Sequence, residues 1–431
     1  MRYFSLNDHS ITASFEEAVV QGIARDRGLF FPKKIPRLPA SFFEEISIFS
    51  STEIAKEVIS PFIGEEIPEE ALIDIIEKTL DFDFPVNELE PNVSVLELFH
   101  GPTLAFKDVG AKFMAGCLEY FIKKGTGGEV TVLVATSGDT GGAVANGFLG
   151  VEGIKVVILY PSGKVSELQE RQLTTLGRNI TALEVDGAFD ECQDMVKTAF
   201  LDREVTEKVQ LTSANSINIA RWLPQMFYYF LAWKDLKEKN KKLVFSIPSG
   251  NFGNICAGLM AAEMGLPIDH FVASTNANDV VPAFLSSGKF SDQPSVATIS
   301  NAMDVGNPSN FVRILEMFEN NMESLKKKLS AFSFDDDLTK DAMKAVYHNS
   351  NYIMDPHGAV GYLGLRSFLK KNKDFYGVFL ETAHPVKFAD TVKEATGREI
   401  EIPSAIADIM NSEKKAEKIS TYEDLKSFLL R

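Results

Sequence analysis

Cysteine is scarce in this 431-residue chain, and its spacing excludes the usual roles of clustered thiols. The three cysteines, Cys117, Cys192 and Cys256, lie far apart, and none belongs to a C-x-x-C pair. An odd number of distant cysteines argues against a disulfide framework and is typical of buried, reduced thiols in a cytosolic protein. We therefore expect the protein to be cytoplasmic.

Long hydrophobic runs are also missing. Stretches such as VVILY and FYYFLAW are far shorter than the about 20 residues that a membrane helix needs. The N-terminal stretch MRYFSLNDHSITASF contains no continuous apolar segment, so we expect no secretory signal. The composition, with 45% hydrophobic and 24% charged residues, is ordinary for a soluble globular protein.

Positive charge is in deficit, because 44 Lys and Arg residues stand against 60 Asp and Glu residues and the net charge is -16. General binding to nucleic acid or to an anionic membrane is disfavoured, since such surfaces need clustered positive charge. A small anionic substrate remains compatible with this balance, provided that a local pocket overrides the negative field.

Several catalytic motifs are absent as well. No Walker A loop occurs, and no strand–helix turn matches G-x-G-x-x-G, so NTP hydrolysis and hydride transfer are disfavoured. His9, His270, His348 and His357 show no paired-ligand spacing, and we expect no metal site. No G-x-S-x-G elbow supports a serine hydrolase, although a catalytic triad need not be local in sequence.

The chain is long enough for two or three domains of about 150 residues. Residues 1–90 are interpreted as a helical N-terminal domain, with an amphipathic helix over residues 14–26 that Gly28 stops. The segment FFPKKIPRLP is interpreted as a connector, because its prolines cannot continue a helix. The acidic residues between positions 65 and 90 are best explained as a solvated helix face.

From about residue 129, short β-branched runs alternate with helical stretches. The predicted strands are EVTVLVA, IKVVILY, NITALEV, KKLVFSIP, IDHFVAST and FYGVFLE, and a charged helical tail closes the chain. Such alternation predicts an α/β fold with doubly wound, mostly parallel sheets covered by helices on both faces.

Two turns in this region are rich in Gly, Ser, Thr and Asn: ATSGDTGGA (residues 135–143) and IPSGNFGN (residues 247–254). Parallel sheets bind ligands beyond the carboxyl ends of their strands, and glycine lets the backbone approach a ligand closely. The amides of a helix N-terminus also favour an anion. Each turn by itself is also compatible with an ordinary tight connection, which needs the same residue types.

Lys107 lies in the apolar segment FHGPTLAFKDVGAKFM. Desolvation lowers the pKa of a lysine and suits it to Schiff-base chemistry. The alternative is an exposed lysine that pairs with Asp108 or caps a turn. A reactive lysine together with two anion-binding turns matches pyridoxal phosphate, whose aldehyde and phosphate need these two kinds of site.

The chain resembles the threonine synthases, which are fold-type II (tryptophan-synthase-β-like) pyridoxal-phosphate enzymes. The matching segments are SFEEAVVQGIARDRGLFFP, ELFHGPTLAFKDVGAKFM, ATSGDTGGAVANGF, SANSINIARWLPQ, PSGNFGN and ETAHPVKF, which span most of residues 14–390. The resemblance implies a threonine-synthase-type N-terminal domain over residues 1–90. It also implies a catalytic region over residues 91–431, built from two α/β subdomains with the cofactor in the cleft between them.

The resemblance assigns roles residue by residue. Lys107 is implied as the Schiff-base lysine, Thr382 as the partner of the pyridine nitrogen and Asp139 as a residue at the cofactor's 3′-oxygen. The cofactor phosphate is assigned to Gly250, Asn251, Phe252, Gly253 and Asn254. The substrate carboxylate is assigned to Thr136, Ser137 and Thr140, and the substrate phosphate to Asn215, Ser216 and Arg221.

Two segments depart from the family's pattern. The opening YFSLNDHS lacks the Ser-Thr-Arg-Gly run common near the family's N-terminus, which leaves any substrate contact from that domain undefined. Asp139 stands where some relatives carry Asn, so the resemblance does not fix its partner. His100 and His384 flank the site segments, and for both a packing or hydrogen-bonding role is favoured over acid–base work.

The implied activity is conversion of O-phospho-L-homoserine and water to L-threonine and phosphate by pyridoxal-phosphate-dependent γ-elimination and β-hydration. A serine/threonine dehydratase, or a phosphohomoserine lyase that releases 2-oxobutanoate, is the first alternative. A non-catalytic protein that binds a phosphometabolite is the second. We expect a monomer or homodimer with a small-molecule substrate and with no nucleic-acid or membrane partner.

Overall fold

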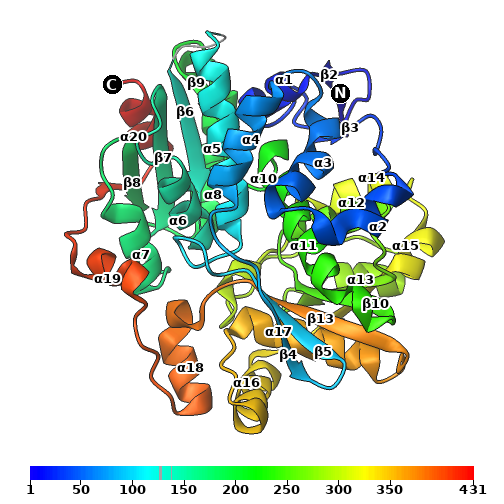
Figure 1. The fold of residues 1–431 in the computed structure, drawn as a ribbon. Coiled ribbons are helices and arrows are strands. Elements are labelled where there is room, and N and C mark those ends of the chain that lie inside the picture. The colour runs from blue at the N-terminus through cyan, green and yellow to red at the C-terminus, as the bar shows by residue number, and fades with distance from the viewer. Residues whose placement is uncertain (126–128, 137) are drawn as a thin grey trace.

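The computed structural model describes residues 1–125, 129–136 and 138–431 and contains three sheets (Figure 1). The N-terminal sheet has the order β2-β1-β3, and both pairings are antiparallel. Four helices accompany it in the sequence up to residue 80. These elements are β1 (Tyr3–Ser5), β2 (Thr12–Ala13), α1 (Phe15–Gln21), β3 (Phe30–Pro32), α2 (Ala40–Glu45), α3 (Ser51–Ile63) and α4 (Glu69–Thr79).

Helix α1 is shorter than the sequence predicted. Ser14 begins it with a capping box to Glu17, as the residue types favour. The predicted end at residue 26 is wrong, because Gly22 adopts a φ of 71° and caps the helix there. The interpretation of FFPKKIPRLP as a connector is also wrong for its first residues, since Phe30–Pro32 pairs with β1.

A six-stranded sheet has the order β12-β11-β10-β13-β5-β4, and it is parallel except for the pair β4–β5. Side chains alternate across β10: Val244 packs with the hydrophobic cluster of α16 and α17, whereas Phe245 and Ile247 pack with that of α11 and α12. Helices therefore cover both faces. The elements are β4 (Val86–Glu90), β5 (Val93–Glu97), α11 (Met226–Leu236), β10 (Lys242–Pro248), α12 (Gly253–Glu263), β11 (His270–Thr275), α13 (Val280–Ser287), α14 (Phe311–Met317), α15 (Met322–Lys328), β12 (Leu329–Ser333), α16 (Asp336–Ser350), α17 (Pro356–Leu369) and β13 (Phe375–Glu381).

A five-stranded parallel sheet has the order β14-β8-β7-β6-β9. On β6, Val132 and Val134 face the large core with α5, whereas Leu133 and Ala135 face the cluster of α8 and α20. The fold class predicted from the sequence is confirmed. The elements are α5 (Lys107–Lys123), β6 (Val130–Ala135), α6 (Asp139–Gly147), β7 (Ile154–Pro161), α7 (Glu167–Thr174), β8 (Ile180–Val185), α8 (Phe189–Leu201), α9 (Arg203–Thr206), β9 (Gln210–Thr212) and α10 (Ile219–Trp222).

The C-terminal tail is more than the charged helix that the sequence predicted. It runs through the 3-10 turn η5 (Pro385–Phe388), α18 (Ala389–Thr396) and α19 (Ser404–Asn411). It then returns to the five-stranded sheet as β14 (Glu417–Ile419) before α20 (Tyr422–Leu429), as Figure 1 shows in orange and red. No helix in the described ranges is long and apolar enough to cross a bilayer.

Candidate active site

Lys107 is the first residue of α5 and follows the loop that leaves β5. This loop is tied to the end of β13, because the Phe106 amide donates to the Thr382 carbonyl at 3.0 Å and Ala105 forms a bridge with Ala383. Burial lowers the pKa of Lys107 to about 8, with the charge of Asp139 acting in the opposite direction. The predicted reactive lysine thus has the environment that its chemistry needs.

The turn IPSGNFGN joins β10 to α12. Phe252 adopts a left-handed conformation with a φ of 60° and precedes Gly253, the first residue of the helix. Gly250 is required by a close approach, because a Cβ atom there would lie 2.6 Å from the Cα of Met303. The backbone amides at this helix start point out of the α-helical ladder and form an anion cradle.

Asn254 uses its side chain for the core. Its Oδ1 accepts hydrogen bonds from the hydroxyls of Tyr228 at 2.8 Å and Tyr229 at 2.7 Å. Its Nδ2 is buried with no hydrogen-bond partner among the described residues. At this helix start, the backbone amide of Asn254 and its unpaired Nδ2 are the donors of this residue that remain available to an anion.

The segment assigned to the substrate phosphate touches this turn. Ser216 Oγ accepts from Asn251 Nδ2 at 3.2 Å and from Asn310 Nδ2 at 3.1 Å. Ser216 also packs beside Gly253, where a Cβ atom would lie 3.3 Å from the Cβ of Ser216. Residues assigned to two different phosphates from sequence therefore lie next to each other.

Arg221 brings a cation to α5, because its Nε lies beside Gly110 of that helix. It is 2% exposed, and its Nη1 donates to the Ala214 carbonyl at 2.5 Å. Its Nε is buried without a partner among the described residues, as is Oδ1 of Asn215. Burial lowers the pKa of Arg221 to about 10, and its charge acts on Lys107. An unpaired guanidinium nitrogen of this kind suits a bound phosphate.

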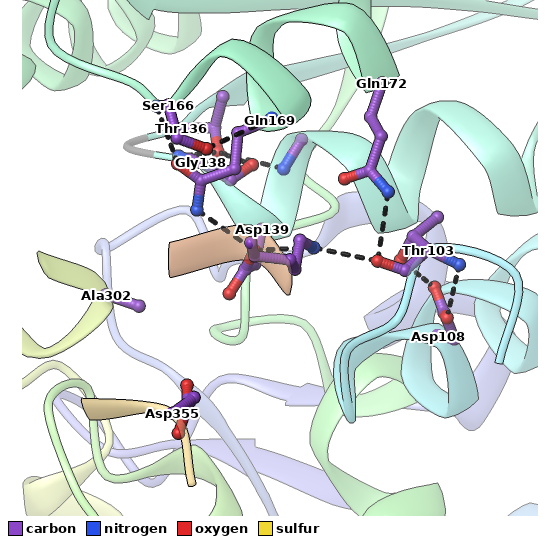
Figure 2. A network of polar contacts seen from close by, with 12 residues as sticks. Thr103, Asp108, Thr136, Gly138, Asp139, Ser166, Gln169, Gln172, Ala302 and Asp355 are labelled. Atoms are coloured by element: carbon purple, nitrogen blue, oxygen red, sulfur yellow. Dashed lines mark hydrogen bonds and ion pairs between the residues drawn. The ribbon is translucent and has the colours of Figure 1, made fainter. Parts of the chain in front are cut away.

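Asp139 begins α6 and lies in a buried polar network (Figure 2). Its Oδ1 is 2.7 Å from the Lys387 ammonium and accepts from Gln169 Nε2 at 3.1 Å. Burial by itself would raise the pKa of Asp139, but the charges of Lys387 and then Lys107 outweigh burial and hold the pKa well below its usual range. The structure thus supplies the partner that the sequence left open.

Lys387 is the functional residue that the sequence analysis missed. It lies in the quoted segment ETAHPVKF and is 2% exposed. The only local signal was a lysine between Val386 and Phe388, and such an apolar setting does not reveal a partner hundreds of residues earlier in the chain.

The other residues of the first glycine-rich turn are placed differently. The Thr136 hydroxyl accepts from the amides of Gly138 at 3.0 Å and Gly141 at 2.9 Å, so it shapes the turn itself. Thr140 is partly exposed in the first turn of α6. Ser137 lies outside the described residues, and the assignment of these three residues to a substrate carboxylate stays a prediction.

Thr382 is 6% exposed at the carboxyl end of β13. The ring of His384 packs against Phe99 with centroids 5.1 Å apart, and its Nδ1 accepts from the Val386 amide at 3.1 Å. Burial lowers the pKa of His384 to about 4, so the ring is neutral near pH 7. His100 pairs with Glu97 at 2.8 Å. These contacts agree with packing and hydrogen-bonding roles for both histidines.

The assembled residues fit pyridoxal phosphate. Lys107 offers an amine with a lowered pKa, and the backbone at Gly250 and Gly253 leaves a cradle that a Cβ atom would fill. The buried Nε of Arg221 offers a further anion contact beside the same lysine. All three features lie at carboxyl ends of parallel strands or at the helix starts that follow them, where ligands of such sheets bind.

The chain matches three protein families along its length. Residues 84–376 match the family described as "Pyridoxal-phosphate dependent enzyme". Residues 2–80 match "Threonine synthase N terminus", and residues 358–429 match "Threonine synthase, C-terminal".

Similar proteins agree with these matches. Threonine synthase of Serratia marcescens is 45% identical over 410 residues, which cover 94% of each chain. The crystal structure of threonine synthase from Escherichia coli superposes with a TM-score of 0.93 at 43% identity, covering 100% of this chain and 99% of that one. The structure of threonine synthase with bound pyridoxal phosphate from Brucella melitensis gives a TM-score of 0.92 at 34% identity, with 100% and 99% covered. The chain therefore belongs to the threonine synthases, the pyridoxal-phosphate-dependent lyases of amino-acid biosynthesis.

Proposed function

We propose that this protein converts O-phospho-L-homoserine and water to L-threonine and phosphate, with Lys107 as its catalytic residue. The observation that carries the proposal is a pair of anion sites of different kinds, and the cation of one of them, Arg221, acts on Lys107. A backbone cradle at Gly250 and Gly253 suits the cofactor phosphate, and the buried guanidinium of Arg221 suits a second phosphate. A substrate without a phosphate group would not need that second, cationic site.

The domain organisation follows the elements that supply the site. We assign residues 1–90 to the N-terminal domain and residues 91–431 to the catalytic region, with β4 (Val86–Glu90) at the boundary contributing the edge strand of the six-stranded sheet. Within this region, the five-stranded sheet carries Asp139 and the six-stranded sheet carries Thr382. We assign Lys107, the cradle at Gly250 and the cofactor to the cleft between the two subdomains. Three buried cysteines without disulfides support a cytoplasmic location.

Substrate binding is assigned to neutral and cationic groups together. Asn215, Ser216 and Arg221 hold the substrate phosphate, and the backbone of residues 250–254 holds the cofactor phosphate. Thr136, Ser137 and Thr140 bind the substrate carboxylate. Because the chain carries a net charge of -16, a dianionic substrate needs the local cation of Arg221 to overcome repulsion.

Proton transfer is assigned to Lys107. When bound, pyridoxal phosphate supplies a conjugated ring that spreads negative charge from the substrate's reacting carbon. The Lys107 amine removes the Cα proton, for which it must be neutral. Its pKa of about 8 leaves a useful neutral fraction near pH 7. A Cβ proton is then lost and the γ-phosphate leaves. After Cγ gains a proton, water adds at Cβ and Cα regains its proton, which completes the conversion.

Thr382 and Asp139 are assigned to two different polar atoms of the cofactor ring. The Thr382 hydroxyl meets the ring nitrogen and cannot hold it protonated as a carboxylate would. The weaker electron withdrawal that results favours elimination over transamination. Asp139 lies at the 3′-oxygen, where its charge is balanced by Lys387.

Product analysis tests the proposed reaction. The purified protein is incubated with pyridoxal phosphate and O-phospho-L-homoserine, and threonine, inorganic phosphate and 2-oxobutanoate are quantified. Threonine and phosphate in equal amounts are expected. Phosphate with 2-oxobutanoate would identify a lyase that skips hydration, and binding of the cofactor without any product would identify a non-catalytic phosphometabolite-binding protein.

A further inference from the structure

Lys387 is a fully buried lysine in the turn η5, between the end of β13 and α18. Its ammonium group makes two polar contacts, one with Asp139 Oδ1 at 2.7 Å and one with the Thr103 carbonyl at 2.8 Å. A buried charge is costly unless it is paired and hydrogen-bonded, and here both conditions hold. The contacts join one lysine to two segments that lie far away in the sequence.

Each partner belongs to a segment of the site. Thr103 lies in the loop that leads to Lys107, and Asp139 opens the helix after the first glycine-rich turn. Two glutamines from α7 support the arrangement. Gln169 donates to Asp139 at 3.1 Å, and Gln172 donates to the Thr103 carbonyl at 3.1 Å. Figure 2 shows both glutamines reaching down from the same helix toward Asp139 and Thr103.

Thr103 also forms hydrogen bonds with the start of α5. Its amide donates to Asp108 Oδ2 at 2.9 Å, and its hydroxyl also donates to the Asp108 carboxylate. Asp108 is the residue directly after Lys107. The Thr103 carbonyl, which Lys387 holds, and the backbone of Lys107 are therefore joined by a short path of buried hydrogen bonds.

The charges around Lys107 show how this arrangement can affect the protonation of Lys107. The charged groups that act on the Lys107 amine are Asp139, Lys387 and Arg221. Those that act on Asp139 are Lys387, Lys107 and His357. With Lys387 in place, the Asp139 carboxylate already has a cation as its partner. Without it, Lys107 would exert the largest remaining positive charge effect on the buried carboxylate.

We propose that Lys387 is a positioning residue for the proposed reaction: its ammonium group holds the Asp139 carboxylate and the Thr103 carbonyl together and keeps the Lys107 amine from becoming the partner of Asp139. The proposal rests on the assignment of Lys107 as the catalytic lysine. Lys387 itself contacts neither substrate nor cofactor in this role, and it acts through Asp139 and Thr103.

The test measures the protonation of Lys107 in the protein freed of cofactor. The apo-protein is labelled briefly with acetic anhydride across a pH series, and acetylation of Lys107 is quantified by peptide mass spectrometry. For the unaltered chain, the midpoint is expected at a pH of about 8. In Lys387→Met, the unpaired Asp139 carboxylate should stabilise the Lys107 ammonium form. The midpoint should then rise by about 1–3 pH units, the usual effect of an opposite charge at close range.

A second variant separates charge from packing. Lys387→Met combined with Asp139→Asn removes both charges, so the labelling midpoint should return to within about half a pH unit of the unaltered chain. Lys393→Met is the matched control, because Lys393 lies nearby in α18 and pairs at the surface with Glu399 at 2.7 Å. It should change neither the Lys107 midpoint nor turnover.

Two results would overturn the proposal. One is a Lys107 midpoint in Lys387→Met that equals that of the unaltered chain. The other is a double variant that fails to fold, or that folds with a raised midpoint, because Lys387 would then serve the scaffold alone. If Lys387→Met does not fold, the double variant decides between these outcomes by the same labelling curve.

Product analysis distinguishes a failure of the positioning role from a failure of the proposed reaction. If the unaltered protein makes no threonine but Lys387→Met still shifts the Lys107 midpoint, the reaction is wrong and the positioning role stands. If threonine is formed and the midpoint does not move, only the positioning role is wrong. With both intact, Lys387→Met should lower kcat for the phosphorylated substrate more than it raises KM.

Discussion

The two glycine-rich turns look alike in sequence, yet the structure uses them in opposite ways. The turn before α12 contains no charged side chain, and its proposed role in binding the cofactor phosphate depends on backbone amides and on close packing at Gly250. The turn before α6 contains Asp139, whose buried charge is matched by Lys387 from the other end of the chain. Two turns of similar composition therefore differ in charge: the turn before α12 is neutral, and the turn before α6 carries a buried ion pair.

This difference follows from what each turn has to hold. A phosphate of fixed charge can be bound by helix-terminal amides, which cannot lose a proton and need no counterion. A group that exchanges protons needs surroundings that set its pKa. Burial lowers the pKa of Lys107, and the charges of Asp139, Lys387 and Arg221 act on it as well. Substitutions that remove a charge should therefore mainly change turnover. Substitutions that move the backbone of the cradle should mainly change cofactor affinity.

The largest effect on turnover is expected from Lys107→Ala, which removes a charged group of the site. Turnover should fall by roughly 10³-fold or more, because the variant loses both covalent attachment of the cofactor and proton transfer. The neutral cradle should still bind the cofactor without a covalent link. Activity, and the near-ultraviolet absorbance of cofactor that stays with the protein after borohydride reduction and dialysis, are the measurements.

The control for this change is Lys112→Ala on the same helix. Lys112 pairs with Asp81 at 2.5 Å near the surface, so its removal should leave turnover and cofactor attachment in place. Covalent attachment that persists in Lys107→Ala would move the catalytic assignment, with Lys112 as the next candidate.

Arg221→Ala tests whether the cofactor phosphate and the substrate phosphate have separate binding sites. Loss of a charge-assisted contact should cost about 2–3 kcal/mol in kcat/KM for O-phospho-L-homoserine, or roughly 30- to 150-fold. Cofactor binding should persist, and slow turnover of serine should change far less. Arg366→Ala, at a surface pair with Glu90, is the control. An equal loss for both substrates would contradict the assignment of Arg221 to the substrate phosphate.

Gly250→Ala should disturb the neutral backbone cradle before α12. The new Cβ atom would lie 2.6 Å from the Cα of Met303, so the backbone must shift. Overpacking of this kind costs about 1–3 kcal/mol, and we expect a roughly tenfold weaker cofactor affinity. Titration of the apo-protein with pyridoxal phosphate measures the change. Gly187→Ala, which meets only the side chain of Glu191, should bind as the unaltered protein does.

The smallest effect is expected from Thr382→Asp, which adds charge where the ring nitrogen is assigned. A carboxylate there should hold the ring protonated and raise the share of side products by a few-fold, roughly, relative to threonine. Product ratios from O-phospho-L-homoserine measure this, with Thr382→Ser as the conservative control. If Thr382→Asp and Thr382→Ser give the same ratio, Thr382 does not meet the ring nitrogen.

Much of the fold could be read from local patterns. The strands around VTVLVA, KVVILY and LVFSIP were predicted because β-branched runs between turn residues report strands directly. Strands with weaker local signals were missed. Phe30–Pro32 carries a proline and pairs with β1 only because the N-terminus folds back, and Glu417–Ile419 is a strand only because β8 offers it an edge.

The sequence by itself determined the cofactor class and predicted the lysine and the two glycine-rich turns. Each prediction starts from neighbouring residues, and the resemblance of whole segments to the family gave each its role. The tertiary structure alone decided which charges meet. Asp139 finds Lys387, and Ser216 finds Asn251. These pairs exist because parallel strands bring the starts of distant helices together, and the order of strands in a sheet is not written in any local pattern.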